Sequence, residues 1–293
     1  MMSNLLVHAA RSLSLKLNRV IGSLGGGAAP PYRVLVFGLV GLIALLACGG
    51  EARGADQRRV LVYTKNQVGK GLYVHDNIAA CAAAIKKMGA ENDFAVDVSD
   101  DPGAFTDDNL KRYRALVFDN TNNEIFDNES QKEALQRYIR AGGGFVGLHS
   151  ASGSMRQWPW FWSMLGGKFN RHARFQKFTV LVKDPKDPAT AHLPPKFEWT
   201  DEFYYLDHMA EGLHVLLAGD LSSVDDPAKD KYPGAKFGNE VPLAWRHEFD
   251  GGREWYTALG HKSEAYSDPK LTQLILGGIL WAMGGNDVKA AAK

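Results

Sequence analysis

The sequence predicts an α/β fold with a mostly parallel sheet covered by helices on both faces. From residue 59 onward, short apolar segments alternate with segments of helical periodicity, which is typical of parallel strands joined by helices. Polar residues directly follow several of the strand segments. The chain has 293 residues, 45% of them hydrophobic and 23% charged, which suits a globular protein with a sizeable core.

Up to residue 150 the predicted strands and helices alternate. The run VLVYT at residues 60–64 is short, apolar and typical of a buried parallel strand. A helix that Asp127 or Asn128 can cap extends to Ile139, and the glycines at 142–144 stop it. The predicted strands span residues 60–64, 94–98, 115–118 and 145–148, and the first predicted helix spans residues 76–88.

The pattern changes after about residue 170, where strand candidates follow one another without helices between them. A last apolar helix is predicted over residues 271–283, with Trp281 packed inward. The strand candidates are residues 175–182, 204–206, 214–217, 242–249 and 255–259. We predict one mixed α/β domain over residues 58–286, followed by a tail at 287–293.

The first 57 residues differ in composition and predict an export signal. The first fifty contain basic residues but no Asp or Glu, and an uncharged apolar run follows at residues 34–47. This run has 14 residues, which is shorter than the roughly 20 needed to span a bilayer. The protein is therefore expected to be periplasmic or secreted. The alternatives are a lipoprotein, since Leu45-Leu46-Ala47-Cys48 resembles a lipoprotein signal, and an uncleaved anchor.

Charge and cysteine content narrow the classes of partner. The formal net charge of +1 gives no indication of nucleic-acid binding. Membrane contact is expected only through the N-terminal signal or a lipid on Cys48. The only other cysteine is Cys81, so a processed or lipidated chain would have no intramolecular disulfide.

Polar residues at the ends of predicted strands indicate where a site would lie. Thr64-Lys65-Asn66 follows the first strand, Asp119-Asn120 follows the third, and His149-Ser150 follows the fourth. Ligands of open parallel sheets bind beyond the carboxyl ends of the strands, so we expect these side chains to share one rim.

His149 occupies the sharp exit of the fourth strand, where related α/β folds place a nucleophile. The Gly-x-Ser-x-Gly motif of hydrolases is absent and no cysteine is nearby, so neither serine nor thiol catalysis is indicated. The glycines at 142–147 precede and lie within the strand, so a dinucleotide site is not indicated either.

The run GGGFVGLHSA at residues 142–151 resembles the signature of the ThuA-like (trehalose utilisation) family. Other segments of the family pattern follow in order, and the resemblance covers about residues 59 to 285. They include VLVYTK at 60–65, HDNI at 75–78, LGGKF at 165–169 with His172, DEFYY at 201–205, PLAW at 242–245, YTALGH at 256–261 and GILWA at 278–282. The resemblance implies a flavodoxin-like fold of the class I glutamine amidotransferase type and carbohydrate-related work.

The resemblance also limits which family properties carry over. The amidotransferase nucleophile is a cysteine at the position of His149, so glutaminase activity is not expected. Asp187-Pro188 replaces the frequent His-Pro of the family, and Ala173 replaces the proline after His172. Any metal site that depends on that stretch is therefore not inferred from the family.

We predict catalytic roles for His149, His75 and Glu202, with the histidines acting as general acids and bases on a sugar or keto-sugar. The substrate-binding candidates are Asn120, His172, His261 and Trp160. An aromatic ring such as that of Trp160 stacks well on sugars but can equally fill a core.

An alternative is that His75, His149, His172 and His261 hold zinc or another divalent ion, although no compact metal motif is present. The alternative function is a non-catalytic sugar-binding or accessory protein of the cell envelope.

Overall fold

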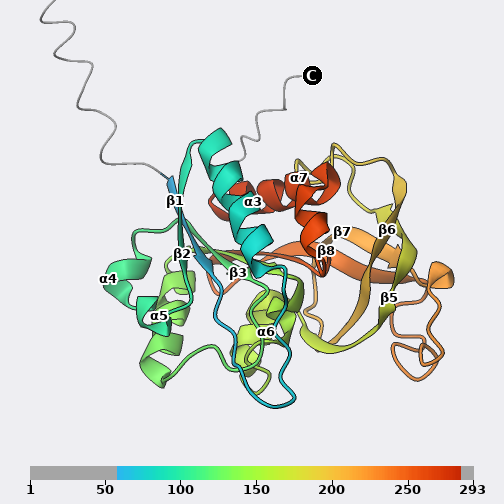
Figure 1. Cartoon of the computed structure of the whole chain (residues 1–293), viewed down its shortest axis with the longest axis horizontal. Helices are drawn as coiled ribbons and strands as arrows, with labels where there is room; N and C mark the ends of the chain where they lie inside the picture. The colour runs from blue at the N-terminus through green and yellow to red at the C-terminus, as the bar shows by residue number, and fades with distance from the viewer. Residues whose placement is uncertain (1–57, 285–293) are drawn as a thin grey trace, which may run out of the picture. The chain divides into compact units, whose positions relative to one another are not determined.

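The computed structural model describes residues 58–284, which form a single mixed α/β unit (Figure 1). The expected signal at residues 1–57, its Cys48 and the tail at 287–293 lie outside the described residues. Within residues 58–284, no helix has the length and apolar character to cross a membrane.

One half of the nine-stranded sheet is parallel. It contains five neighbouring strands in the order β2-β1-β3-β4-β9. The strands β3 and β4 are buried throughout, and β1 is buried from Val60 to Tyr63, because helices cover both faces of this half. The strands are β1 (Arg58–Tyr63), β2 (Phe94–Ser99), β3 (Ala115–Asp119), β4 (Gly144–Leu148) and β9 (Gly252–Thr257).

The other half of the sheet is antiparallel, so the expectation of a mostly parallel sheet is not confirmed. The order continues β9-β8-β7-β5-β6, and each of these neighbouring pairs is antiparallel. These strands are joined by loops without the crossover helix that parallel pairing requires. They are β5 (Lys168–Val182), β6 (Lys196–Asp207), β7 (His214–Asp220) and β8 (Glu240–Phe249).

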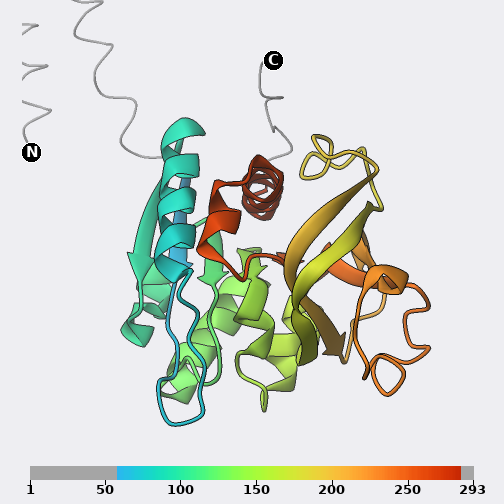
Figure 2. The ribbon, with the colours of Figure 1, turned by 45° about the vertical axis from the view of Figure 1, so that its right-hand side comes forward.

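Helices cover both faces of the parallel half, as predicted (Figures 1 and 2). The helices α3 (Ile78–Glu91) and α7 (Pro269–Ala282) contact each other on one face. The helices α5 (Glu129–Arg140) and α6 (Pro159–Leu165) lie on the other, where the short α4 (Asp107–Leu110) contacts α5. Asn128 caps α5 by accepting a hydrogen bond from Gln131 N.

Helix α6 was not predicted, although its boundaries have sequence signals. Pro159 stands at its first turn and Gly166 ends it in the left-handed conformation, which is the usual placement of these two residues. The aromatic residues of the segment suggested a cluster, and their helical spacing was not recognised. Its Phe161 is fully buried in the core.

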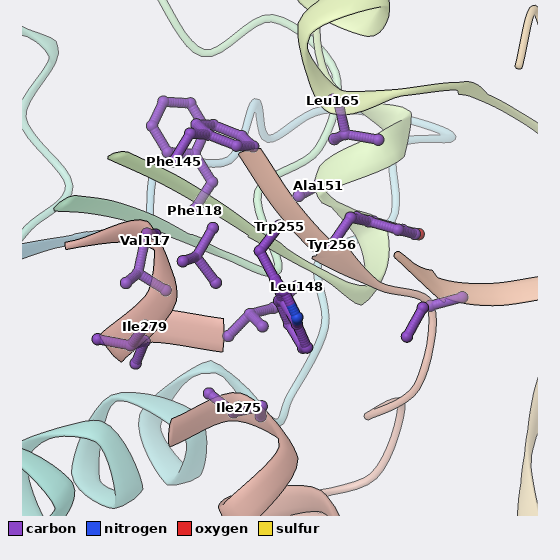
Figure 3. Packing of buried hydrophobic residues seen from close by; sticks show 14 of the residues in the cluster. Val117, Phe118, Phe145, Leu148, Ala151, Leu165, Trp255, Tyr256, Ile275 and Ile279 are labelled. Carbon is purple, nitrogen blue, oxygen red and sulfur yellow. The ribbon is translucent and has the colours of Figure 1, made fainter. Parts of the chain in front are cut away.

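The central core lies between α7 and the parallel strands (Figure 3). Ile275 and Ile279 of α7 point toward Trp255 of β9 and Leu148 of β4. Trp281, expected to pack inward, is only half-buried, and the Arg246 guanidinium lies 5.1 Å from the centroid of its ring. Trp281 therefore packs against the edge of the core, while Ala282 beyond it is fully buried.

Candidate active site

The parallel strands bring three predicted histidines to one rim. His149 directly follows β4, His261 lies four residues beyond β9, and His75 lies between β1 and α3. Their ring centroids are 4.8 Å apart for His75 and His149, 5.2 Å for His75 and His261, and 5.5 Å for His149 and His261. The carboxyl ends of these strands thus form a shared site, as the topology predicted.

The antiparallel half supplies the acidic member of the site. Glu202 lies in the middle of β6, and its carboxylate reaches three imidazoles. Glu202 Oε2 lies 3.2 Å from His261 Nδ1 and 3.6 Å from His149 Nε2, while Oε1 lies 3.5 Å from His172 Nδ1. Burial favours the neutral acid, but the neighbouring His149 and His261 outweigh it and hold the pKa of Glu202 well below its usual value. The group is therefore a carboxylate near neutral pH.

The orientation and tautomer of His149 are fixed by its neighbours. Its Nδ1 lies 2.6 Å from the carbonyl oxygen of Ala258, which can only accept, so Nδ1 carries the proton. In the neutral imidazole, Nε2 then presents its lone pair to the cavity side, where the Tyr204 hydroxyl donates to it at 2.9 Å. A backbone carbonyl behind one ring nitrogen is the usual support of a metal-binding or acid–base histidine.

His75 is buried, and neither of its ring nitrogens has a hydrogen-bond partner within residues 58–284. Burial, reinforced by His149 and His261, lowers the pKa of His75 to about 3. The ring is therefore neutral and offers a lone pair to the centre of the cluster. His261 Nδ1 is also buried, and its close neighbour among the described residues is the Glu202 carboxylate at 3.2 Å. Unpartnered buried polar atoms are costly, so this arrangement favours a ligand that satisfies them.

Four residues of the cluster have donor atoms that one metal ion could bind. Each of His75, His149, His261 and Glu202 offers an atom within 4.8 Å of the others. His172, predicted as a fourth histidine ligand, is not part of this set, and its side chain is 42% exposed. Neutral imidazoles, a carboxylate and a carbonyl-backed Nδ1–H suit zinc or a similar divalent ion, so the residues fit such a group.

The cluster opens into a cavity of about 410 Å³. Two exposed aromatic side chains flank His261 near the mouth of this cavity. The ring centroid of Tyr73 lies 6.4 Å from that of His261, and that of Phe175 lies 5.7 Å from it. The cavity-lining residues are Tyr73, His75, Asn122, Ser150, Gly153, Arg156, Phe169, His172, Glu202, Tyr204 and His261.

Asn120 supports the site from below and does not line the cavity. It is fully buried, accepts a hydrogen bond from Asn77 Nδ2 at 3.1 Å and donates to the Tyr266 hydroxyl at 2.9 Å. Asn77 also donates to the carbonyl oxygen of His261 at 3.0 Å. The predicted binding residue therefore holds the loop that carries His261.

Asp201 has a similar supporting role, which the sequence analysis missed. It is buried and accepts hydrogen bonds from the backbone N–H groups of Gly260 at 2.8 Å and His261 at 3.1 Å. The carboxylate thereby ties the turn after β9 to strand β6. The signal for this role in the sequence was that Asp201 directly precedes the predicted Glu202 in a strand whose side chains alternate between two faces.

Trp160, expected at the pocket, does not line it. The residue lies on α6, where its Nε1 donates to Asp250 at 3.2 Å and its ring stacks on Trp158. The pocket aromatics are instead Tyr73, Phe169 and Tyr204. Trp160 lies on a helix, and the helical periodicity of α6 turns its side chain away from the rim. The alternation of side chains along a strand does not apply to this segment.

Comparisons with known proteins agree with this architecture. A family model described as trehalose utilisation, ThuA, matches residues 59–282. A search of curated proteins gives no match. A ThuA-like protein from Bacteroides uniformis is 23% identical, with a TM-score of 0.60 over 80% of this chain and 94% of that chain. One from Parabacteroides merdae is 19% identical, with a TM-score of 0.62 over 81% and 94%.

At these identities the two structures support the fold alone, and they fit the expected flavodoxin-like arrangement. The family model covers most of the chain, from the first strand to the end of α7. The matched range includes the strand-exit His149 and the buried His261, which lie in the cluster described above. The chain therefore belongs to the ThuA (trehalose utilisation) family.

Proposed function

We propose that this protein is a carbohydrate-active enzyme whose chemistry is assisted by a divalent metal ion held by His75, His149, His261 and Glu202. The observation that carries the proposal is the convergence of three buried imidazoles on one carboxylate at the wall of a cavity. A bound divalent ion would supply Lewis-acid polarisation of a sugar oxygen. Its failure to bind at this cluster would remove the basis of the proposal.

The remaining residues of the site would orient the sugar and move protons. Engagement of His149 Nε2 by a ligand would leave the Tyr204 hydroxyl free to donate to a sugar oxygen. His172 lies at the exposed side of Glu202, with its Nδ1 3.5 Å from the carboxylate. Its imidazole is thus placed to exchange a proton with a substrate hydroxyl and pass it toward Glu202.

The carbohydrate assignment is supported by the mouth of the cavity. Tyr73 is 54% exposed and Phe175 is 44% exposed, although both are large aromatic side chains. Aromatic faces stack on the apolar faces of sugar rings. A cavity of about 410 Å³ falls in the size range of small-molecule sites. The family's description, trehalose utilisation, agrees with a sugar ligand.

Metal binding is tested on the purified full-length protein stripped with a chelator. Titration of Zn²⁺ should give one tight site per chain, and His75→Gln or His261→Gln should weaken it at least about tenfold. His192→Gln is the matched control, because His192 is exposed and lies outside the cluster. Equal affinity in all three variants would contradict a metal site at the cluster.

Turnover distinguishes the enzyme from the non-catalytic alternative. The metal-loaded protein is incubated with native and oxidised (keto) disaccharides, and products are followed by chromatography. We expect turnover that is lost on removal of the metal and in Glu202→Gln. Sugar binding without turnover, unchanged in Glu202→Gln, would support the alternative of a sugar-binding or accessory envelope protein.

We also propose that the chain is exported, on the basis of its N-terminal composition alone. Fractionation of cells that express the full chain with a C-terminal tag should place it in the periplasm or medium. Release from the membrane by Cys48→Ala would indicate a lipid anchor, whereas retention of the full-length chain in the cytosol would contradict export.

A further inference from the structure

We propose that the cavity contains an anion-binding subsite formed by Arg156 and Ser150, so that the substrate is an acidic sugar carrying a carboxylate or phosphate group. The subsite stands on its own observations, while the sugar part of the inference rests on the proposed function. Both residues line the cavity and follow β4 within one short stretch of chain.

Arg156 has no acidic partner within ion-pairing distance among residues 58–284. Its Nε donates to the Gly153 carbonyl oxygen at 3.0 Å, and its guanidinium lies 5.3 Å from the ring centroid of Phe169. Two other half-buried arginines, Arg171 and Arg246, are each paired with an aspartate. A half-buried guanidinium with free donors on the wall of a cavity is suited to bind a carboxylate or phosphate.

Ser150 gives a second and independent indication of a ligand. The residue is 3% exposed, and its hydroxyl has no hydrogen-bond partner among the described residues. A buried hydroxyl without a partner is destabilising, so its position on the cavity wall favours a ligand oxygen that accepts a hydrogen bond from it. An oxygen of the same anionic group, or of the adjoining sugar carbon, would satisfy it.

The arrangement places the subsite beside the histidine cluster and separate from it. The guanidinium of Arg156 lies over Phe169, whose ring centroid is 4.8 Å from that of Tyr204. The Tyr204 ring is in turn 4.3 Å from that of His149. Phe169 and Tyr204 thus connect the cation to the cluster, and both side chains line the cavity that a sugar would occupy.

The charges within the cavity favour one orientation of such a ligand. Without a metal ion, the carboxylate of Glu202 on the side of the cluster would repel an anionic group, whereas a bound divalent ion would take up that charge. The Arg156 guanidinium, which has no acidic partner among the described residues, lies over Phe169 on the cavity wall. In the metal-free protein, an acidic sugar would therefore place its anionic group on Arg156, whose donors are free, and its neutral hydroxyls toward His149 and Glu202.

Isothermal titration of the metal-loaded full-length protein with glucuronate, glucose 6-phosphate and glucose tests the proposal. We expect at least one acidic sugar to bind at least about tenfold more tightly than glucose, with an affinity that falls as salt is raised. Arg156→Gln should remove that advantage, a loss of about 10- to 100-fold, and leave glucose binding unchanged. Ser150→Ala should weaken the same ligand several-fold.

The control is Arg174→Gln, because Arg174 is an exposed arginine of β5 that does not line the cavity. Thermal unfolding of each variant confirms that it is folded. The preferred acidic sugar identifies the anion as carboxylate or phosphate. Equal binding of glucose and both acidic sugars, unchanged in Arg156→Gln, would overturn the subsite.

Inorganic phosphate is titrated separately, so that the two proposals can fail independently. Arg156-dependent binding of phosphate without binding of any sugar would support the anion subsite and contradict the carbohydrate assignment. Absence of binding by phosphate and by all three sugars would overturn both.

Discussion

His149 has an unusual backbone for a residue with a side chain. Its φ is +47°, in the left-handed region that favours glycine. Two contacts hold it there: the Nδ1 contact to Ala258 and a hydrogen bond from the Tyr256 hydroxyl to the His149 carbonyl oxygen at 2.8 Å. A strained residue fixed by several neighbours is typical of functional sites, and here the conformation aims Nε2 at the cluster.

Replacement of His149 by asparagine separates the role of the imidazole from the role of the turn. Asparagine tolerates the left-handed conformation, so His149→Asn should fold. The variant lacks Nε2, and its Zn²⁺ affinity should fall by about 10- to 100-fold. Competition with a chromophoric chelator measures the affinity, and circular dichroism checks the fold. Wild-type affinity in a folded His149→Asn protein would contradict the assignment of Nε2 as a ligand.

Glu254 is a buried acid that the site does not use. It is 1% exposed, neither carboxylate oxygen has a hydrogen-bond partner among the described residues, and burial raises the pKa of Glu254 well above its usual value. The group is thus neutral when folded at a pH where the unfolded chain is ionised. It costs little below about pH 4, and the cost grows as pH rises above the unfolded pKa.

Glu254→Met should therefore stabilise the protein in a pH-dependent manner. Methionine has a similar length and no charge, so we expect an increase of about 1–3 kcal/mol in the free energy of unfolding at pH 8 and a smaller one at pH 4. Denaturant unfolding at the two pH values measures it. Glu248→Met is the control, because Glu248 is exposed on β8 and should show no such gain. A loss of stability at pH 8 would be inconsistent with an unpaired buried acid.

Among the elements, α7 depends on a close approach to β9. A methyl group at Gly278 would lie 2.4 Å from the nearest ring atom of Trp255, which is far closer than van der Waals contact. The glycine therefore allows the helix to pack directly on the tryptophan. Since β9 leads into the loop of His261, this packing also supports the site.

Gly278→Ala should destabilise the protein, although alanine favours helices more than glycine does. The steric cost of overpacking is about 1–3 kcal/mol, against a propensity gain of at most about 1 kcal/mol. The midpoint of thermal unfolding should fall accordingly. Gly69→Ala is the control, because the added methyl group would make only ordinary contact with Leu72. A rise in the midpoint for Gly278→Ala would show that α7 is looser than described.

At the scale of the whole molecule, the site is shared between the two halves of the sheet. The parallel half contributes His75, His149 and His261, and the antiparallel half contributes Glu202 and Tyr204. Neither half carries the full set, so the cluster forms only when β6 is in register with β5 and the sheet is continuous through β7, β8 and β9. Ligand binding should therefore stabilise the entire domain.

Zn²⁺ at about 100 times its dissociation constant should raise the free energy of unfolding by about 2.7 kcal/mol. The rise should be smaller at pH 5 than at pH 7.5, because protons compete for the imidazoles. Differential scanning fluorimetry of chelator-treated protein measures it, with His75→Gln as the variant whose response should be clearly smaller. Mg²⁺, a hard ion that prefers oxygen ligands, should give no comparable shift. An equal response of His75→Gln would place the binding elsewhere.

The alternation of elements, the rim at the ends of β1, β3 and β4, and the position of His149 at the strand exit could all be predicted from the sequence. These features are local, because hydrophobic periodicity and polar strand ends are readable over a few residues. Membership of the family was also readable, since its motifs lie in order along the chain. Asn120 lies near the site, as predicted, but no local pattern in the sequence shows that its side chain is buried beneath the rim.

Which residues contact one another depends on the folded chain. Glu202 reaches the cluster because strand register and alternation within β6 turn its side chain to that face, and a shift of one residue would present Asp201 instead. The unpaired state of Arg156 and the exclusion of Trp160 likewise depend on distant neighbours. Such contacts join residues far apart in the chain, and no local pattern specifies the packing that brings them together.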